Sequence, residues 1–185
     1  MTARYDVIFL HGGSSSGKTG IARCLQALLP RPWLRTGVDV LLDTIPARLQ
    51  GAEDGIRFRP DGGIEVGAAF RQLRHAWRAG VVATVCAGVP MIIDEVFLRG
   101  CAEQLEWQQA LAGLRTLWIG VQCAADVAEG RELARGDRVV GMARAQAVLV
   151  HAGVSYDLVV DTTHTEALEC AQRIVNELNE TTSQL

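Results

Sequence analysis

A glycine- and serine-rich segment containing one cation is the first place in the sequence that could do chemistry. Residues 12–19 read GGSSSGKT and fit the pattern GxxxxGK[ST], directly after an apolar run and before a helical pattern. Such a loop points successive backbone N–H groups at phosphate oxygens, and the following helix adds the positive end of its dipole. The required strand and helix make a plain flexible turn a poor alternative. We expect a nucleoside triphosphate to be bound by Gly12, Gly13, Ser14, Ser15, Ser16, Gly17, Lys18 and Thr19.

Lys18 is the single lysine of the chain, beside 17 arginines. A compact ammonium on a flexible stem suits the space between β- and γ-phosphate oxygens, and the hydroxyl of Thr19 is placed for Mg²⁺. A GTPase that reads guanine through an N-K-x-D motif would need a second lysine, so that class is excluded. The loop by itself does not identify the phosphate acceptor.

Two acids follow predicted strands on the edge of the sheet where the loop also lies. Asp39 comes after Thr36-Gly-Val38, and Asp94 closes the run Met91-Ile-Ile93. Ligands of open parallel sheets bind at this edge. Asp39 could accept the proton of an acceptor hydroxyl, or it could be the N-cap of a helix. Its position in the sequence favours neither role over the other. Asp94 fits a Walker B acid that orients Mg²⁺, with a cap or loop acid as the alternative.

Three arginines late in the chain, Arg131, Arg135 and Arg138, have the spacing i, i+4, i+7. They would share one helical face and could close over the transferred phosphate as a lid, because guanidinium groups suit phosphate oxygens. The alternative is a solvated face on which they pair with Glu129, Glu132 and Asp137. The break at Gly136 favours the lid.

Apolar runs alternate with amphipathic ones along the chain, which is typical of an α/β protein with a parallel sheet. We expect one domain over 1–185, a hairpin or flap at 51–66 and a helical lid at 124–152. In the helix expected at 67–87, Phe70, Leu73, Trp77 and Val81 should face the core. The predicted strands lie at 5–11, 33–38, 90–94, 116–121 and 156–161, and further helices at 18–29, 39–49, 101–112 and 165–179.

The composition of the chain limits the kinds of binding partner that we expect. The net charge of −3 gives no general attraction to nucleic acid or to an anionic membrane. The five cysteines are scattered, and neither a signal peptide nor a membrane span is visible, so we expect a cytoplasmic protein with reduced thiols. The sequence is compatible with a homo-oligomer but does not specify one.

Beyond these motifs the chain resembles the chloramphenicol phosphotransferases over nearly its whole length. The shared segments are Gly12-Gly-Ser-Ser, Gly17-Lys18, Cys24-Leu-Gln26, Pro32-Trp-Leu34, Gly37-Val-Asp39, Ile92-Ile-Asp94, Val96-Phe-Leu98, Val127-Ala-Glu-Gly-Arg131, Ala134-Arg-Gly-Asp-Arg-Val139 and Val160-Asp-Thr-Thr-His164. The resemblance implies a P-loop kinase fold with a five-stranded parallel sheet flanked by helices. It implies transfer of the ATP γ-phosphate to the primary (C3) hydroxyl of chloramphenicol, which protects against the antibiotic.

The resemblance also assigns roles. It makes Asp39 the base for the acceptor hydroxyl, Lys18 a phosphate ligand, Thr19 a Mg²⁺ ligand, and Arg135 and Arg138 lid arginines. His11 and Glu95 depart from the family pattern, and we expect His11 to border the acceptor pocket and influence the substrate. Two alternatives therefore remain. One is a related kinase of another small hydroxylated metabolite or antibiotic. The other is a nucleotide-binding regulatory module, which would have no need of Asp39 as a base.

Overall fold

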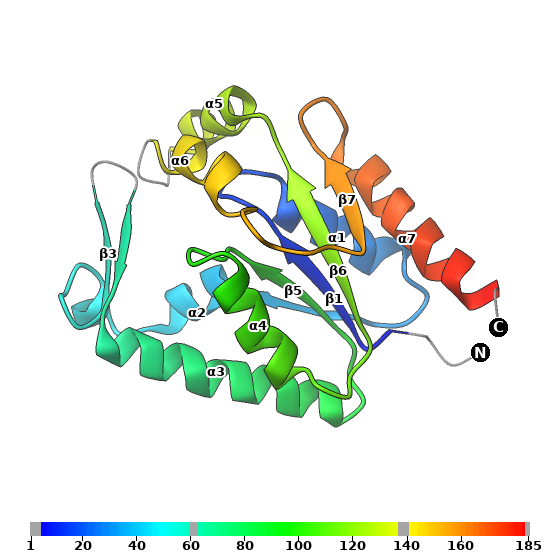
Figure 1. Ribbon diagram of the computed structural model, residues 1–185, viewed down its shortest axis with the longest axis horizontal. Helices are drawn as coiled ribbons and strands as arrows, with labels where there is room; N and C mark the ends of the chain where they lie inside the picture. Colours follow the sequence, from blue (N-terminus) through cyan, green and yellow to red (C-terminus); the bar gives the residue numbers. More distant parts are fainter. Residues whose placement is uncertain (1–4, 60–62, 137–140, 184–185) are drawn as a thin grey trace.

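A computed structural model describes residues 5–59, 63–136 and 141–183. Five parallel strands form the central sheet in the order β2-β5-β1-β6-β7. Figure 1 shows helices on both faces of this sheet, with α1 (Lys18–Leu28) and α7 (Ala167–Ser183) on one face and α3 (Ala68–Cys86) and α4 (Cys101–Ala110) on the other. The predicted α/β class and five-stranded parallel sheet are confirmed. The strands are β1 (Val7–His11), β2 (Leu34–Gly37), β5 (Met91–Glu95), β6 (Thr116–Gln122) and β7 (Leu158–Asp161).

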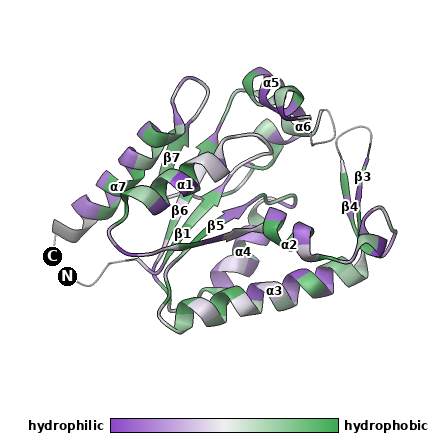
Figure 2. Cartoon of the chain, turned by 180° about the vertical axis from the view of Figure 1, so that it is seen from behind, coloured by the Kyte–Doolittle hydropathy of each residue, from purple (hydrophilic) through white to green (hydrophobic). Residues whose placement is uncertain are grey.

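The central strand β1 is buried along its whole length because helices cover both sides of it. Successive side chains of a strand point to opposite faces. Ile8 and Leu10 accordingly pack in the cluster under α1 and α7, whereas Val7 and Phe9 pack in the cluster under α3 and α4. Figure 2 shows these strands as a hydrophobic centre within helices of mixed hydropathy.

The segment expected to form a flap contains an antiparallel hairpin of β3 (Ile56–Phe58) and β4 (Ile64–Val66). The hairpin stands beside the start of α3, away from the central sheet (Figure 1). The helix expected at 39–49 is shorter in the structure: α2 covers Val38–Thr44, and a separate 3₁₀ turn, η1, covers Ala47–Leu49. The reason is Pro46, which disfavours helical geometry at Ile45, where ψ is 148°.

The long helix α3 covers almost the predicted range, and Phe70 and Val81 are buried in two different clusters. Trp77 packs partly buried against both clusters. The prediction for Leu73 is wrong, because its side chain is 37% exposed. The buried stripe of the helix therefore shifts toward positions such as Arg78, a polar residue that a hydrophobic pattern does not mark.

The segment expected to form a lid contains α5 (Ala125–Arg135) and α6 (Met142–Leu149), which pack against each other. The predicted interruption is present: α5 ends at Gly136, which adopts the left-handed conformation with φ of 67°. Arg138 lies outside the described residues. Within the described ranges, no helix is long and apolar enough to cross a membrane.

Candidate active site

The phosphate loop connects β1 to α1, and two of its glycines are required by geometry. A Cβ on Gly12 would lie 2.3 Å from the carbonyl oxygen of Val121. Gly17, which immediately precedes α1, has φ of 91°, a value that favours glycine. The loop can therefore pass close to β6 and then turn so that the N-terminus of α1 faces the space above the sheet.

Lys18 and Thr19 begin α1 and bring their polar groups to the end of β5. The Lys18 Nζ donates a hydrogen bond to the Gly13 carbonyl at 2.7 Å and lies 3.8 Å from the Asp94 carboxylate. The Thr19 hydroxyl donates to the other Asp94 oxygen at 2.7 Å. A hydroxyl and a carboxylate beside a phosphate loop form the kind of oxygen site that Mg²⁺ takes together with substrate phosphates.

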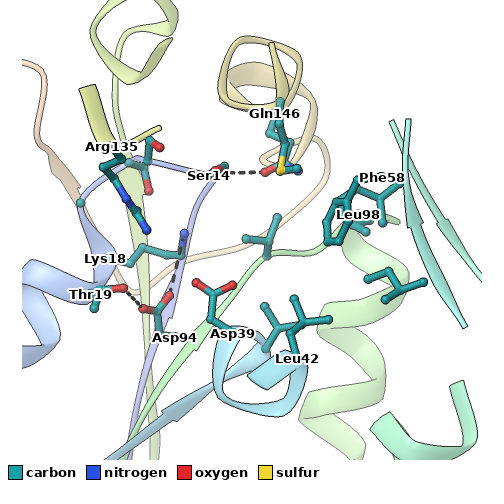
Figure 3. Close-up of a pocket in the computed structure, with 18 of the residues that line it drawn as sticks. Ser14, Lys18, Thr19, Asp39, Leu42, Phe58, Asp94, Leu98, Arg135 and Gln146 are labelled. Atoms are coloured by element: carbon teal, nitrogen blue, oxygen red, sulfur yellow. Dashed lines mark hydrogen bonds and ion pairs between the residues drawn. The ribbon is translucent and has the colours of Figure 1, made fainter. Parts of the chain in front are cut away.

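Asp39 lies in the first turn of α2, whose N-cap is Gly37, so the alternative role of Asp39 as helix N-cap is wrong. Gly37 pairs in register with Asp94, and a Cβ on Gly37 would lie 2.1 Å from the Asp94 carbonyl oxygen. This close approach brings the start of α2 to the end of β5. Figure 3 shows the Asp39 carboxylate directed into a cavity that Lys18 and Asp94 also line.

Arg131 and Arg135, both from α5, line the same cavity. Arg131 donates to the Thr162 hydroxyl at 3.1 Å and to the Thr162 carbonyl at 2.6 Å. The Thr162 hydroxyl in turn donates to the carbonyl of Ser16, so α5 is tied to the phosphate loop through the residue after β7. Arg135 extends from α5 toward the phosphate end of the cavity (Figure 3).

Of the three partners that the surface-pairing alternative assigned to these arginines, two have other roles in the structure, and the third, Asp137, lies outside the described residues. Glu129 pairs with Arg144 at 2.7 Å. Glu132 is buried and accepts the backbone N–H groups of Gly141 and Ala143, which caps the start of α6. These two glutamates therefore connect α5 to α6.

The cavity has a volume of about 440 Å³ and two chemically different ends. One end is the phosphate loop with its cations and carboxylates. The other end is formed by the hairpin, α2, α3 and the segment after β5, and its walls are mostly apolar (Figure 3). The apolar residues that line the cavity are Val38, Leu42, Ile56, Phe58, Ile64, Val66, Phe70, Val96, Leu98, Ala134 and Met142.

His11 is not among the described residues that line this cavity, so the expectation that it borders the acceptor pocket is wrong. Its side chain is 1% exposed, and its Nε2 accepts the Phe97 backbone N–H at 3.1 Å. The Nδ1 then carries the proton and donates to the Tyr156 hydroxyl at 2.7 Å. Burial, with Lys18 nearby, lowers the pKa of His11 to about 2, so this histidine is a neutral structural residue.

Two polar residues near the site, Gln146 and Arg74, were not identified from the sequence, and Glu95 was noted there only as a departure from the family pattern. The Gln146 side chain of α6 is buried and accepts the Ser14 backbone N–H at 2.8 Å, which ties α6 to the loop. Arg74 of α3 lines the cavity and pairs with the buried Glu95 at 3.3 Å. Glu95 points to the opposite face of the sheet from Asp94, and burial raises the pKa of its carboxyl group to about 7. Contacts between segments that lie this far apart leave no local signal in the sequence.

A parallel sheet with a phosphate loop after β1, acids at the ends of β2 and β5, and arginines on α5 define a P-loop kinase. The comparisons agree, and the chain belongs to the family of chloramphenicol phosphotransferase-like proteins, whose family model matches residues 5–179. A Mycobacterium tuberculosis (strain H37Rv) protein named "Putative O-phosphotransferase" is 29% identical over 91% of this chain and 80% of its own length.

Solved structures share the fold at low sequence identity. A sugar kinase from Janibacter sp. superposes with a TM-score of 0.64 at 18% identity, covering 95% of each chain. The APS kinase of M. tuberculosis, in complex with AMPPNP and APS, has a TM-score of 0.63 at 14% identity and covers 96% of this chain and 98% of its own. Shikimate kinase from Acinetobacter baumannii has a TM-score of 0.59 at 16% identity, with 97% and 96% covered.

Proposed function

We propose that this kinase transfers the γ-phosphate of ATP to the hydroxyl of a small, largely apolar alcohol, and that the primary (C3) hydroxyl of chloramphenicol is the acceptor. The observation that carries the proposal is the two-ended cavity, in which a phosphate loop and Asp39 face a mostly apolar compartment. A ligand pocket of this kind binds apolar surface by burial and orients the ligand with few polar groups. Membership of the family supports chloramphenicol as the first acceptor to test.

The phosphate end fits ATP with Mg²⁺. The loop amides and Lys18 would hold the phosphates, while Thr19 and Asp94 offer the hydroxyl and carboxylate oxygens that Mg²⁺ prefers. When bound, the ion neutralises charge on the phosphates. Arg131 and Arg135 would contribute further positive charge from α5, and we expect Arg138 to join them.

In the proposed reaction Asp39 accepts the proton of the acceptor hydroxyl while the oxygen attacks the γ-phosphorus. A bond forms between that oxygen and phosphorus, the bond from phosphorus to the β-γ bridging oxygen breaks, and ADP leaves with the electron pair. Lys18 and Arg135 stabilise the charge that develops on the transferred group. The apolar walls would limit access of water, which otherwise competes as acceptor.

Two other functions can be distinguished from this one. A kinase of another hydroxylated metabolite would bind ATP and phosphorylate a different alcohol. A regulatory module would bind ATP without any acceptor, although a carboxylate directed into the cavity beside the loop, as Asp39 is, has no evident use in that role.

The test is incubation with Mg-ATP and chloramphenicol, with the phosphorylated drug detected by mass spectrometry. We expect turnover by the wild type and a loss of at least about 100-fold in Asp39→Asn, because general base catalysis contributes on this scale. ATP binding, measured by calorimetry, should persist in this variant. Asp43→Asn is the matched control, since Asp43 is an exposed residue on the same helix.

Equal turnover by Asp39→Asn and Asp43→Asn would refute the assignment of the base. If ATP binds but chloramphenicol is not modified, chloramphenicol is not the acceptor. A screen of alcohols against radiolabelled ATP then separates a kinase with another acceptor from a regulatory module.

A further inference from the structure

Gln146 is a buried amide side chain at the point where α6 touches the phosphate loop. It lines the cavity, is 6% exposed, and its Oε1 accepts the Ser14 backbone N–H at 2.8 Å. A Cβ on Gly13 would lie 3.2 Å from the Gln146 Cβ, so α6 packs directly against the loop here. Figure 3 shows Gln146 between Ser14 of the loop and the apolar residues Phe58 and Leu98. The amide therefore lies where the two ends of the cavity meet.

The hydrogen bond to Ser14 fixes which way the amide of Gln146 is turned. A backbone N–H can only donate, so the amide oxygen faces Ser14 and the NH₂ group is the other branch. In the described part of the chain, no residue accepts a hydrogen bond from Nε2 of Gln146. This nitrogen is also not among the partnerless side-chain atoms that are sealed in the core. Its two N–H groups are therefore available to a ligand in the cavity that Gln146 lines.

A second buried glutamine, Gln104 of α4, has a purely structural amide and differs from Gln146 in its bonding. Gln104 is 4% exposed and uses both branches on one residue. Its Oε1 accepts the Ser155 backbone N–H at 3.0 Å, and its Nε2 donates to the Ser155 carbonyl at 2.6 Å. Gln146 uses only its oxygen in the described part of the chain. Tying α6 to the loop requires an acceptor alone, so the NH₂ group of Gln146 has no use in that role.

The surroundings of Gln146 indicate which ligand atoms its N–H groups meet. Lys18 donates to the carbonyl of Gly13 at 2.7 Å, so its ammonium lies at the same part of the loop that Gln146 contacts. In the proposed reaction the transferred phosphate lies between Lys18 and Asp39, both of which line the cavity. Ionised phosphate oxygens only accept hydrogen bonds, and bonds from N–H groups to them are among the strong ones. An uncharged amide can approach these oxygens without repelling the ammonium of Lys18.

We propose that Gln146 is a further catalytic residue, which accepts the Ser14 N–H with its oxygen and donates an N–H of Nε2 to an oxygen of the transferred phosphoryl group. The amide thereby adds one donor to those of the phosphate loop, on the side of the acceptor. It transfers no proton, and it stabilises negative charge on the phosphoryl oxygens while the bond to ADP breaks. This inference rests on the proposed kinase reaction and does not depend on which alcohol is the acceptor.

The experiment compares the wild type with Gln146→Met, which has a side chain of similar length without charge or N–H donor. Calorimetry with Mg²⁺ gives the Kd of ADP and of AMPPNP, and the ratio of the two reports contacts to the third phosphate without any acceptor. Turnover of chloramphenicol gives kcat and KM. We expect the ratio of Kd for ADP to Kd for AMPPNP to fall about tenfold, the scale of one hydrogen bond to a charged group. We expect kcat to fall about 100-fold, with KM for chloramphenicol unchanged.

Gln104→Met is the matched control, because it removes an equally buried amide whose partner is Ser155 and which is not among the described residues lining the cavity. It should lower the free energy of unfolding in urea and leave the Kd ratio and kcat unchanged. If urea unfolding shows that Gln146→Met does not fold, Gln146→Asn replaces it. The amide of that variant is one methylene shorter and cannot reach Ser14 and the phosphoryl group together, so we expect the same two losses.

A role confined to holding the loop predicts that binding of ADP and of AMPPNP weakens by the same factor in Gln146→Met. An unchanged Kd ratio therefore overturns the proposal, whatever happens to KM for chloramphenicol. A lowered ratio with unaltered kcat overturns it too, because the contact would then not serve the transfer. If the wild type does not phosphorylate chloramphenicol, the proposed acceptor is wrong, and the Kd ratio alone decides on Gln146.

Discussion

Replacing His11 with alanine distinguishes a structural histidine from one that chooses the acceptor. His11 is 1% exposed, and its Nε2 accepts the Phe97 backbone N–H at 3.1 Å. The variant leaves that N–H and the hydroxyl of Tyr156 without this partner and opens a small cavity in the core. An unsatisfied buried donor costs about 1–3 kcal/mol, so with the cavity we expect a loss of about 3 kcal/mol in the free energy of unfolding at pH 8.

The same side chain makes stability depend on pH. Its pKa is about 2 in the folded protein, because burial disfavours the charged form, and its ordinary value is 6.5. Below pH 6.5 His11 binds a proton in the unfolded chain but not in the folded chain. The free energy of unfolding therefore falls as pH falls. At about 1.4 kcal/mol per pH unit, protonation of His11 in the unfolded chain lowers the free energy of unfolding of the wild type by about 2 kcal/mol at pH 5. The deficit of His11→Ala should therefore shrink from about 3 kcal/mol at pH 8 to about 1 kcal/mol at pH 5.

The assay is urea unfolding followed by circular dichroism at both pH values, together with KM for a panel of alcohols at pH 8. His164→Ala serves as the control, because His164 is an exposed histidine outside the core. We expect KM values within about twofold of the wild type for both variants, since neither residue borders the cavity. A His11→Ala protein as stable as the wild type at pH 8, with an altered order of acceptors, would refute the structural assignment.

Three further changes test other parts of the site. Lys18→Ala should lower kcat about 100- to 1000-fold, the scale of a lost preorganised charge contact, while the protein stays folded; near-normal turnover would contradict the phosphate-loop assignment. Gly37→Ala places a Cβ 2.1 Å from the Asp94 carbonyl, and should cost about 2 kcal/mol in urea unfolding and most of the activity by separating the ends of β2 and β5. Burial raises the pKa of Glu95 from 4.5 to about 7, so the folded protein holds an extra proton between these values. The difference in the free energy of unfolding between the wild type and Glu95→Gln should then fall by about 3 kcal/mol between pH 4.5 and pH 8, because only the wild type loses this contribution and His11 affects both proteins equally.

The phosphate end was predictable from the sequence because its determinants are contiguous. A loop, its lysine and the helix start lie within residues 12–19, and the two acids follow short apolar runs whose carboxyl ends share one edge. Parallel pairing of β2 with β5 then brings Gly37 and Asp94 into register. The hairpin at β3 and β4 was predictable for the same reason, since its two strands and its turn are adjacent in the chain.

The acceptor end was not predictable in the same way, because it depends on pairs far apart in the sequence. Arg74 is one of 17 arginines, and nothing near it indicates that its partners are Glu95 and Glu103. His11 was misplaced because it precedes the loop in sequence, although its ring lies among Phe97, His151 and Tyr156 in the core. The apolar walls come from several separate elements. The hydrophobic residues of each element, taken alone, have the pattern expected of an ordinary hydrophobic core.

The alternation of β5 explains how one strand supports both halves of the site. Asp94 lies toward Lys18 and Thr19 of α1, whereas the next residue, Glu95, lies toward Arg74 of α3. Because successive side chains point to opposite faces, we expect substitutions on α3 or in the hairpin to alter the apolar end of the cavity without touching the phosphate loop. A one-residue shift in β5 would disturb both halves at once. We therefore expect substitutions in β5 to disturb both ends of the cavity, and we expect the same of α2, which carries Leu42 as well as Asp39.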